Sequence, residues 1–318
     1  GNPSSVHAEG RVARGLVERA RGVIAEAFGA SGSDVIFTSG ATEAAAFALS
    51  GRDLACAPVE HEAVLAWCRA ELGVTSDGAV EAAAPEGMAL QLANSETGIV
   101  QRLPGGVAVV DATQGFGKIP FGFDWSGAQM ALISAHKLGG PKGVGALVVR
   151  RGTDLGALVR GGGQEMGRRA GTENVIGIAG FAAAAQASAQ DLADGAWERV
   201  AELRNILETS LVSGGKETIS IGIDAERLPN TACFVTPGWK GETQVMQMDL
   251  AGFAVSAGSA CSSGKLREST VLRAMGLDPV AAASAMRVSL GPTVWREDVE
   301  RFAESWLRAE KKYRARAA

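Results

Sequence analysis

The sequence predicts an α/β protein in which a large domain with a mostly parallel, doubly wound sheet is followed by a smaller α+β domain. Three observations support this fold class. Short apolar segments alternate with helical segments through residue 150. The run Val107-Ala108-Val109-Val110 is apolar throughout, as in parallel strands that are covered on both faces. The 318 residues include 42 glycines and only 5% aromatic residues, which suits many tight turns between strands and helices.

The first 50 residues predict a helix, a strand and a second helix. Apolar side chains recur at helical spacing over residues 8–28, and a short apolar strand follows at residues 35–38. Ser39-Gly40-Ala41-Thr42-Glu43 then begins an alanine-rich helix that extends to about Leu49. A strand, a turn of small residues and a helix N-terminus leave backbone N–H groups free to bind an anion. For this stretch alone, an ordinary helix cap is an equally good interpretation.

Polar residues follow the next predicted strands. We expect strands over residues 53–57, 90–93, 107–110, 130–133 and 146–149, with a helix after Pro58. Thr42, Asn94, Asp111 and Lys137 all fall at or just after the end of a predicted strand. Ligands of doubly wound sheets bind beyond the carboxyl ends of the strands, so these four residues are candidates for one site.

Lys137 closes the segment Ser134-Ala135-His136-Lys137, which lies between an apolar strand and a glycine-rich turn. An isolated lysine in such a turn is usually solvated. A lysine that is buried there needs a partner charge, or is used in covalent chemistry.

The second half of the chain begins with a glycine-rich, basic loop at residues 161–172. The loop lacks the lysine and hydroxyl ending of a nucleotide-binding P-loop. A long helix is expected over residues 174–212, and its composition becomes charged near Asp191, where we place a boundary between domains 1–191 and 192–318. The later segments predict strands at 219–223, 231–235 and 286–290, and helices near 242–250, near 266–275 and from about 295.

Charge, hydropathy and cysteine content exclude several classes of protein. The 31 basic and 35 acidic residues give a net charge of −4, so neither nucleic acid nor an anionic membrane is an expected partner. No apolar run is long enough to span a bilayer. The four cysteines are scattered without a pairing pattern, which favours a reduced, cytoplasmic protein without a signal peptide. Because the chain begins on Gly1-Asn2-Pro3 with no strand before it, we expect that natural N-terminal residues are missing.

A lysine, a carboxylate at a neighbouring strand end and an anion-binding helix N-terminus are the parts that a pyridoxal phosphate site requires. The lysine binds the cofactor covalently, the carboxylate pairs with the pyridine nitrogen, and the helix N-terminus binds the phosphate.

Eight motifs make this interpretation specific. They are Gly1 to His7, Thr38 to Ala44, Asn94-Ser95-Glu96-Thr97-Gly98, Asp111-Ala112-Thr113-Gln114, Ser134 to Lys137, Gly161 to Thr172, Gly258-Ser259-Ala260-Cys261 and Arg287 to Gly291. Together and in this order, they make the chain resemble a NifS/IscS-type cysteine desulfurase of the class V aminotransferase group. The resemblance covers nearly the whole chain and implies the aspartate aminotransferase-like fold of pyridoxal phosphate enzymes (fold type I).

The resemblance implies roles around the cofactor ring. Lys137 would bind the cofactor covalently and later move the Cα proton of the substrate. Asp111 would pair with the pyridine nitrogen, and Gln114 and Asn94 would lie near the ring hydroxyl. His61 would stack on the ring and serve as a catalytic residue in the acid–base steps.

It also implies the phosphate ligands, which would be Ala41, Thr42, Ser134 and His136 of one subunit and Thr172 of the other. The site would therefore require a homodimer. Arg287, in the small domain, would bind the substrate carboxylate, because a guanidinium group suits bidentate contact with a carboxylate. Asn94 would also contact the substrate.

Cys261 defines the reaction that the resemblance implies. Small residues surround it, and its thiolate would attack the sulfur of bound L-cysteine, which leaves a persulfide on Cys261 and releases L-alanine. The sulfur would pass to an acceptor protein, for example in iron–sulfur cluster assembly. Cys56, Cys68 and Cys233 are interpreted as small buried residues.

Four alternatives remain open at this stage: a selenocysteine lyase, an aminotransferase, a sulfur-relay protein with little turnover of its own, and a protein that binds no cofactor. The sequence also departs from the family pattern, because the family's opening segment is absent and Ala44-Ala45-Ala46 replaces residues that are often asparagine. These departures affect the choice of substrate, not the predicted cofactor site.

Overall fold

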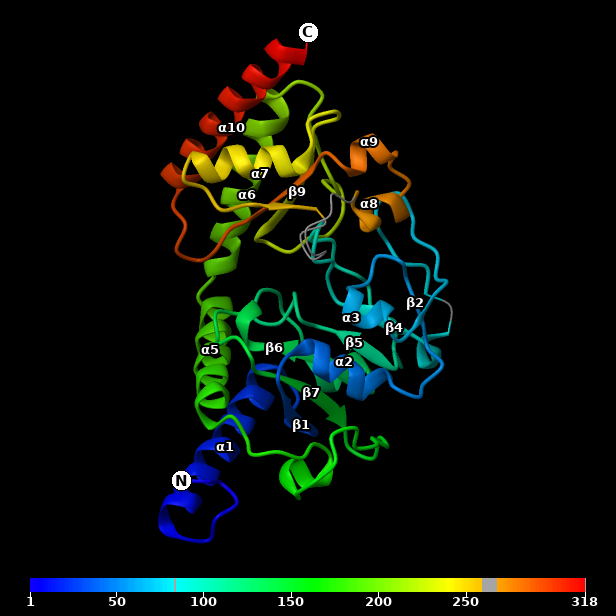
Figure 1. The fold of residues 1–318 in the computed structure, drawn as a ribbon, viewed down its shortest axis with the longest axis vertical. Helices are drawn as coiled ribbons and strands as arrows, with labels where there is room; N and C mark the ends of the chain where they lie inside the picture. The colour runs from blue at the N-terminus through cyan, green and yellow to red at the C-terminus, as the bar shows by residue number, and fades with distance from the viewer. Residues whose placement is uncertain (83, 259–267, 318) are drawn as a thin grey trace. The chain divides into compact units, whose positions relative to one another are not determined.

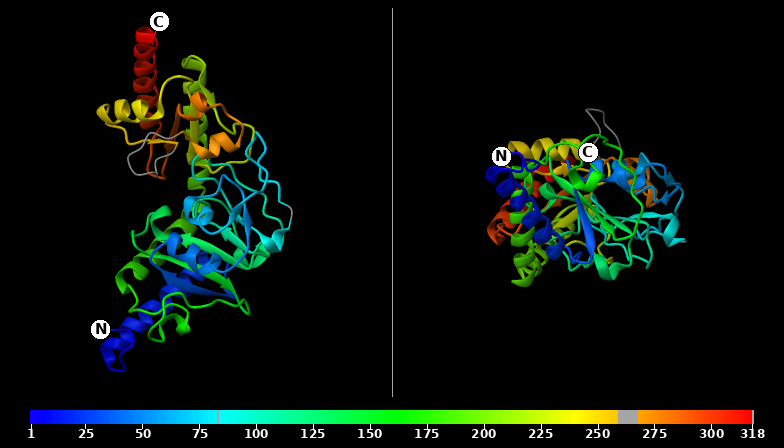
Figure 2. Two further views of the ribbon diagram at one scale, coloured as in Figure 1. Left: turned by 45° about the vertical axis from the view of Figure 1, so that its right-hand side comes forward. Right: turned by 90° about the horizontal axis from the view of Figure 1, so that it is seen from below.

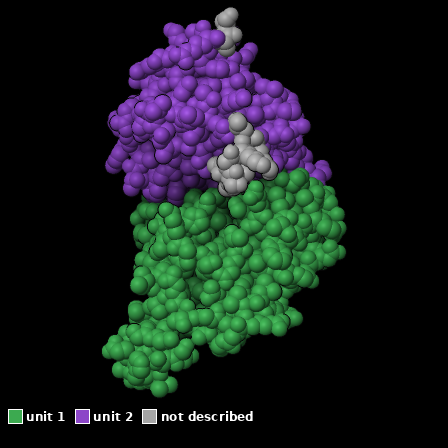
Figure 3. Space-filling model, in the orientation of Figure 1, with its two compact units in different colours: residues 1–72, 82–93, 101–194 green, residues 73–81, 94–100, 195–318 purple. Residues whose placement is uncertain are grey.

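The computed structural model describes residues 1–82, 84–258 and 268–317 (Figure 1). The chain forms two compact units (Figure 3). Unit 1 contains residues 1–72, 82–93 and 101–194, and unit 2 contains residues 73–81, 94–100 and 195–318. Segments 73–81 and 94–100 therefore belong to unit 2, although both lie in the first third of the sequence.

Unit 1 contains α-helices, short 3-10 helices (η) and strands. Its helices are α1 (Ala8–Ala27), α2 (Ala41–Leu49), α3 (Glu62–Leu65), η1 (Pro85–Gly87), α4 (Phe123–Ser126), η2 (Ala135–Lys137), η3 (Gln164–Gly167) and α5 (Val175–Ala193). Its strands are β1 (Ser33–Thr38), β2 (Ala55–Cys56), β3 (Arg69–Ala70), β4 (Ala89–Gln91), β5 (Val109–Asp111), β6 (Met130–Ser134) and β7 (Gly145–Arg150).

The central sheet of unit 1 has the strand order β1-β7-β6-β5-β4. Strands β4, β5 and β6 are parallel, while β7 is antiparallel to both of its neighbours. In this register Asp111 lies opposite Gln91 on one side and Leu132 on the other. The carboxyl ends of the three parallel strands therefore share one edge, as the α/β prediction requires.

Both faces of this sheet are buried. Helix α2 packs on β6 and β7, on the face that carries Ile36, Leu132 and Leu147. Val35 and Val148 point to the opposite face, since side chains alternate along a strand, and they are buried as well. Helix α1 packs along α5 (Figure 1). Coverage on both sides explains why the strands are apolar runs without alternation.

Two helix predictions are corrected. The single helix predicted over residues 174–212 is two helices, α5 and α6 (Ala196–Gly214), separated by Asp194 and Gly195. Gly195 has φ = 73°, in the left-handed region, where an α-helix cannot continue. The helix predicted after Pro58 is shorter than expected, since α3 spans only Glu62–Leu65.

Unit 2 contains an antiparallel sheet and a helical layer. Beyond α6, its elements are β8 (Ile219–Ser220), β9 (Thr231–Val235), α7 (Gly241–Leu250), β10 (Ser256–Ala257), α8 (Thr270–Ala274), α9 (Pro279–Ala282), β11 (Ala285–Ser289) and α10 (Arg296–Ala317). The strand order is β10-β11-β9-β8. Helix α10 packs against α6 and α7 (Figure 1 and Figure 2). The rings of Trp239 and Trp306 lie 5.3 Å apart in this core.

Candidate functional site

The turn that carries Lys137 begins where β6 ends. Ser134 is the last residue of β6 and is buried, and the next three residues form η2. The Ser134 hydroxyl lies 2.9 Å from Nδ1 of His136. The pKa of His136 is lowered, because partial burial and the positive charges of Lys137, Lys142 and Lys118 disfavour the imidazolium form. A neutral imidazole can both donate and accept hydrogen bonds at neutral pH.

Asp111 ends β5, the strand beside β6. One carboxylate oxygen, Oδ1, accepts a hydrogen bond of 2.9 Å from the backbone N–H of Thr113, which turns the chain back after the strand. Gln114 follows in this turn. Since β5 and β6 are parallel neighbours, Asp111 and Lys137 leave the sheet at the same edge. The structure therefore places both residues at the carboxyl-end edge of the parallel strands.

The N-terminus of α2 lies beside the end of β6. A side chain built on Gly40, the residue that precedes α2, would place its Cβ 3.9 Å from the hydroxyl oxygen of Ser134. A Cβ on Gly145 would lie 2.7 Å from the Cα of Gly40, so this approach needs glycine in β7. Ala41 and Thr42, in the first turn of α2, therefore lie near Ser134, and their N–H groups begin a helix that favours a bound anion.

His61 caps the short helix α3. Its Nδ1 accepts a hydrogen bond of 3.1 Å from the N–H of Ala63, and the side chain is exposed. The residue before it, Glu60, is buried and accepts a 2.8 Å hydrogen bond from the backbone N–H of Gln91 in β4. Burial, together with the charges of Asp111 and Cys68, raises the pKa of Glu60 well above its usual value. Sequence reasoning missed Glu60, which fixes His61 to the sheet.

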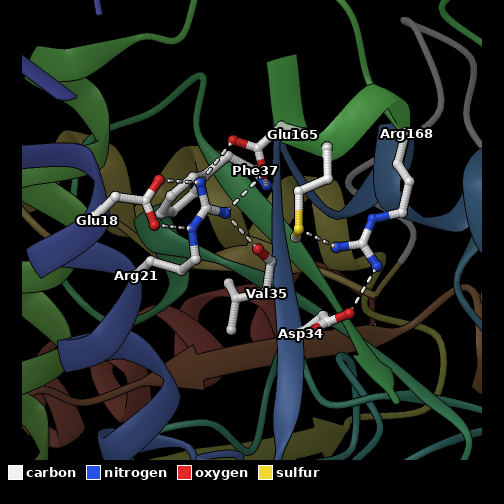
Figure 4. Close-up of polar contacts among 8 residues, drawn as sticks. Glu18, Arg21, Asp34, Val35, Phe37, Glu165 and Arg168 are labelled. Atoms are coloured by element: carbon white, nitrogen blue, oxygen red, sulfur yellow. Dashed lines mark hydrogen bonds and ion pairs between the residues drawn. The ribbon is translucent and has the colours of Figure 1, made fainter. Parts of the chain in front are cut away.

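The glycine-rich loop that contains Thr172 is held on β1 by a buried carboxylate (Figure 4). Oε2 of Glu165 accepts hydrogen bonds from Nη1 of Arg21, at 2.7 Å, and from the backbone N–H of Phe37, at 3.0 Å. Glu165 and Met166 both have positive φ values, of 49° and 56°, which a residue with a side chain adopts at a cost. The ion pair compensates for this local strain.

Two more ion pairs fix the same loop. Arg168 donates a 2.8 Å hydrogen bond to Asp34 (Figure 4), and Arg169 donates one of 2.9 Å to Glu43 in the first turn of α2. Thr172 lines a cavity of about 120 Å³ next to Arg169 and Glu173. These contacts fix the loop within one chain. The predicted role of Thr172 toward a second subunit stays a prediction.

The two predicted substrate ligands, Asn94 and Arg287, belong to unit 2. Asn94 is buried, and its side-chain oxygen accepts hydrogen bonds of 2.9 Å from the N–H groups of Glu96 and Thr97. Arg287, in β11, donates from Nη1 to the carbonyl of Ser95 at 2.7 Å. Its Nη2 donates to the hydroxyl of Ser256 at 3.2 Å. The guanidinium is thus fixed at two points.

The positive charge of Arg287 acts on the Glu96 carboxyl group. Ser269 donates a hydrogen bond to Oε2 of Glu96, and a Cβ on Gly258 would lie 3.2 Å from the same oxygen. Burial raises the pKa of Glu96 to about 7, against the opposing effects of Ser269 and Arg287. Sequence reasoning missed this carboxylate, because nothing in Asn94-Ser95-Glu96 distinguishes it from a solvated glutamate.

Cys261 lies outside the described residues. The other three cysteines have free thiols, and Cys56 and Cys233 are buried as expected, while Cys68 is half-buried. Among the residues that the structure describes, no cluster of His, Cys, Asp and Glu side chains could hold a metal ion. None of the described helices has an apolar stretch of the length that a membrane span requires.

Comparisons with known proteins agree with this geometry. The model of the aminotransferase class-V family matches residues 80–302. The cysteine desulfurase of Cereibacter sphaeroides is 36% identical over 96% of this chain and 87% of its own length. The cysteine desulfurase IscS of Dictyoglomus turgidum is 36% identical over 94% of this chain and 84% of its own.

Solved structures show the same fold. A NifS-like protein from Rickettsia africae superimposes with a TM-score of 0.88 at 28% identity, covering 98% of this chain and 92% of that one. Another NifS-like protein gives a TM-score of 0.86 at 31% identity, with the same coverage of 98% and 92%. This chain therefore belongs to the class V aminotransferase family, and within that family to the NifS/IscS-like cysteine desulfurases.

Proposed function

We propose that this protein is a pyridoxal-phosphate-dependent cysteine desulfurase that converts L-cysteine to L-alanine and transfers the sulfur to Cys261. One observation carries the proposal: Asp111 ends β5 and Lys137 follows β6, its parallel neighbour, and the N-terminus of α2 lies beside the end of β6. The relatives that match nearly the whole chain are named cysteine desulfurases.

The residues of unit 1 fit this cofactor. A protonated pyridine nitrogen needs an anionic partner, and Asp111 is a half-buried carboxylate. One of its oxygens, Oδ1, accepts a hydrogen bond from Thr113, and the other would pair with the pyridine nitrogen. A phosphate needs several donors, and the first turn of α2 offers its backbone N–H groups next to the Ser134 hydroxyl. Lys137, one turn beyond Ser134, is the amine that would bind the aldehyde carbon of the cofactor.

When bound, pyridoxal phosphate supplies an electron sink for the bonds around the substrate Cα. The chain's own residues perform the remaining tasks. The Lys137 amine would move the Cα proton of the substrate, and the Asp111 carboxylate would hold the proton of the pyridine nitrogen. Nδ1 of His61 accepts a hydrogen bond from the N–H of Ala63. The ring face and Nε2 of His61 would therefore be the parts that contact the cofactor or the substrate. Gln114 contributes its side-chain amide, since its backbone carbonyl is bound by Lys118.

Arg287 and Asn94 are proposed to bind the substrate. The guanidinium of Arg287 suits the carboxylate of L-cysteine, and its contacts with Ser95 and Ser256 hold it in one orientation. The Cys261 thiolate then attacks the substrate sulfur. The C–S bond of the substrate breaks, a sulfur–sulfur bond forms on Cys261, and the Cα–Cβ fragment leaves as alanine after protonation. This transfer needs no external oxidant.

The proposal includes a homodimer, in which Thr172 contributes to the partner's phosphate site, a cytoplasmic location and an acceptor protein that takes the sulfur. The anchored loop at residues 161–172 supports the first point, because its three ion pairs hold Thr172 on the surface of unit 1 without help from a partner. Names such as IscS among the relatives support the acceptor.

The test measures alanine and sulfide formed from L-cysteine, with the visible absorbance of the cofactor. Cys261→Ala should keep the absorbance and lose the activity, whereas Lys137→Ala should lose both. Borohydride should fix the cofactor to Lys137 in the unchanged protein. Full activity in Cys261→Ala would exclude the persulfide mechanism. Parallel assays with selenocysteine, with a keto-acid acceptor and with an added sulfur acceptor would reveal a lyase, an aminotransferase or a relay protein.

A further inference from the structure

A second lysine lies next to the site and has no role in the proposed function. Lys118 is 7% exposed, and its Nζ donates a 2.7 Å hydrogen bond to the backbone carbonyl of Gln114. Among the described residues, no carboxylate forms an ion pair with it. A buried ammonium group without a counter-charge is costly, and a lysine that only closed a turn could leave its charge in water.

The turn that carries Lys118 lies against the residues that follow η2. The turn is fixed by Gly117, with φ = 73°, whose carbonyl accepts a 2.8 Å hydrogen bond from the Ser188 hydroxyl of α5. A Cβ on Gly117 would lie 3.7 Å from the Cβ of Leu138, the residue after Lys137. The turn after β5 and the turn after β6 are therefore in contact, and the positive charge of Lys137 acts on Lys118.

Several positive charges act on these two turns. Burial and the charge of Lys137 lower the pKa of Lys118 to about 8. Partial burial and the charges of Lys137, Lys142 and Lys118 all lower the pKa of His136. Asp111 begins the turn that contains Lys118. Two ammonium groups held close together disfavour each other's protonation, and the burial of one of them strengthens the effect because water screens it less.

We propose that Lys118 is a positioning residue for Lys137: held on the adjoining turn, it places a positive charge close enough to Lys137 to keep the Lys137 nitrogen from holding its proton at neutral pH. The inference rests on the proposed function, in which Lys137 binds the cofactor and carries the substrate proton. Both tasks require an amine that gives up its proton readily near pH 7. The hydrogen bond to Gln114 keeps the charge of Lys118 in place.

The experiment titrates the visible absorbance of the cofactor-loaded protein, which reports protonation of the nitrogen that joins the cofactor to Lys137. Lys118→Gln removes the charge and keeps a donor for the Gln114 carbonyl. Lys118→Met removes both, and Lys118→Arg keeps the charge. Lys142→Gln, which removes an exposed lysine charge from the same region, is the matched control. Competitive acetylation of the cofactor-free chain, read at Lys137 by peptide mass spectrometry, measures the same quantity without cofactor or turnover.

In Lys118→Gln and Lys118→Met we expect the pH at which half of the Lys137 nitrogens are protonated to rise by about 1 unit. At a given pH below that midpoint, the unprotonated fraction of Lys137 would then be about tenfold smaller. Lys118→Arg and Lys142→Gln should stay close to the unchanged protein. Equal midpoints in all variants would overturn the proposal, and a shift in Lys118→Met alone would show that Lys118 serves only the hydrogen bond. If borohydride fixes no cofactor at Lys137 in the unchanged protein, the proposed function fails instead, and the acetylation midpoints still decide the role of Lys118.

Discussion

Arg21 and Glu165 together complete the open edge of strand β1. Arg21 donates to the carbonyl of Val35, Glu165 accepts from the N–H of Phe37, and the two side chains pair with each other at 2.7 Å (Figure 4). Since β1 is the outer strand of its sheet, these backbone groups have no neighbouring strand on that side. An ion pair between α1 and the glycine-rich loop thus takes the place of a strand, and it fixes the loop that carries Thr172.

Replacement of Glu165 by Gln should therefore destabilise the protein by about 2 kcal/mol, because the buried part of Arg21 loses its counter-charge. The free energy of unfolding in urea measures the effect. Glu18→Gln is a matched control, since Glu18 pairs with the same arginine at 3.1 Å but its side chain is 56% exposed. We expect Glu18→Gln to lower the free energy of unfolding by no more than about 0.5 kcal/mol. Equal losses in the two variants would mean that the Glu165 pair has no special importance.

The sequence predicts much of this fold, for identifiable reasons. The apolar runs before Asp111 and Lys137 locate the strand ends, and parallel strands bring those ends to one edge. The break at Gly195 was missed, since a glycine inside a helical pattern is often tolerated. The roles of Glu165 and Lys118 were also missed. Their burial depends on segments far away in the chain, and no local pattern distinguishes them from solvated residues.

Glu96 makes stability depend on pH. Its pKa is raised to about 7 by burial, so the folded protein holds a proton that the unfolded chain releases near pH 4.5. The stabilising contribution is complete below pH 4.5 and is lost as the pH rises through 7. Between pH 4 and pH 8, the free energy of unfolding of the unchanged protein should therefore fall by up to about 3 kcal/mol relative to that of Glu96→Gln.

Urea unfolding at a series of pH values checks this prediction. Glu304→Gln, which changes an exposed glutamate on α10 of the same unit, should leave the pH dependence unchanged. A difference between the unchanged protein and Glu96→Gln that stays constant from pH 4 to pH 8 would show that Glu96 titrates normally in the folded state.

The three described cysteines should differ in reactivity. The interaction between the thiols of Cys56 and Cys68 raises the pKa of Cys56 and lowers that of Cys68. Burial raises the pKa of Cys233 to about 12. Since the thiolate is the reactive form, iodoacetamide should alkylate Cys68 at least about tenfold faster than Cys56 or Cys233 at pH 8.

Peptide mass spectrometry of a Cys261→Ser background, sampled over time, measures these rates. In urea the three cysteines should react at similar rates, which controls for local sequence. Cys68→Ser should leave Cys56 as unreactive as before, because Cys56 is still buried. Rapid alkylation of Cys56 in the native protein would contradict the raised pKa of its thiol.

Arg287 offers a direct test of substrate binding. A lysine at this position keeps the positive charge but cannot contact Ser95, Ser256 and a substrate carboxylate from one planar group. For Arg287→Lys we therefore expect kcat/KM for L-cysteine to fall at least about tenfold, mainly through KM, while the cofactor absorbance is kept. Arg273→Lys, in α8 of the same unit and 41% exposed, is the control that should retain activity. An unchanged KM in Arg287→Lys, with the cofactor bound, would assign the substrate carboxylate to another residue.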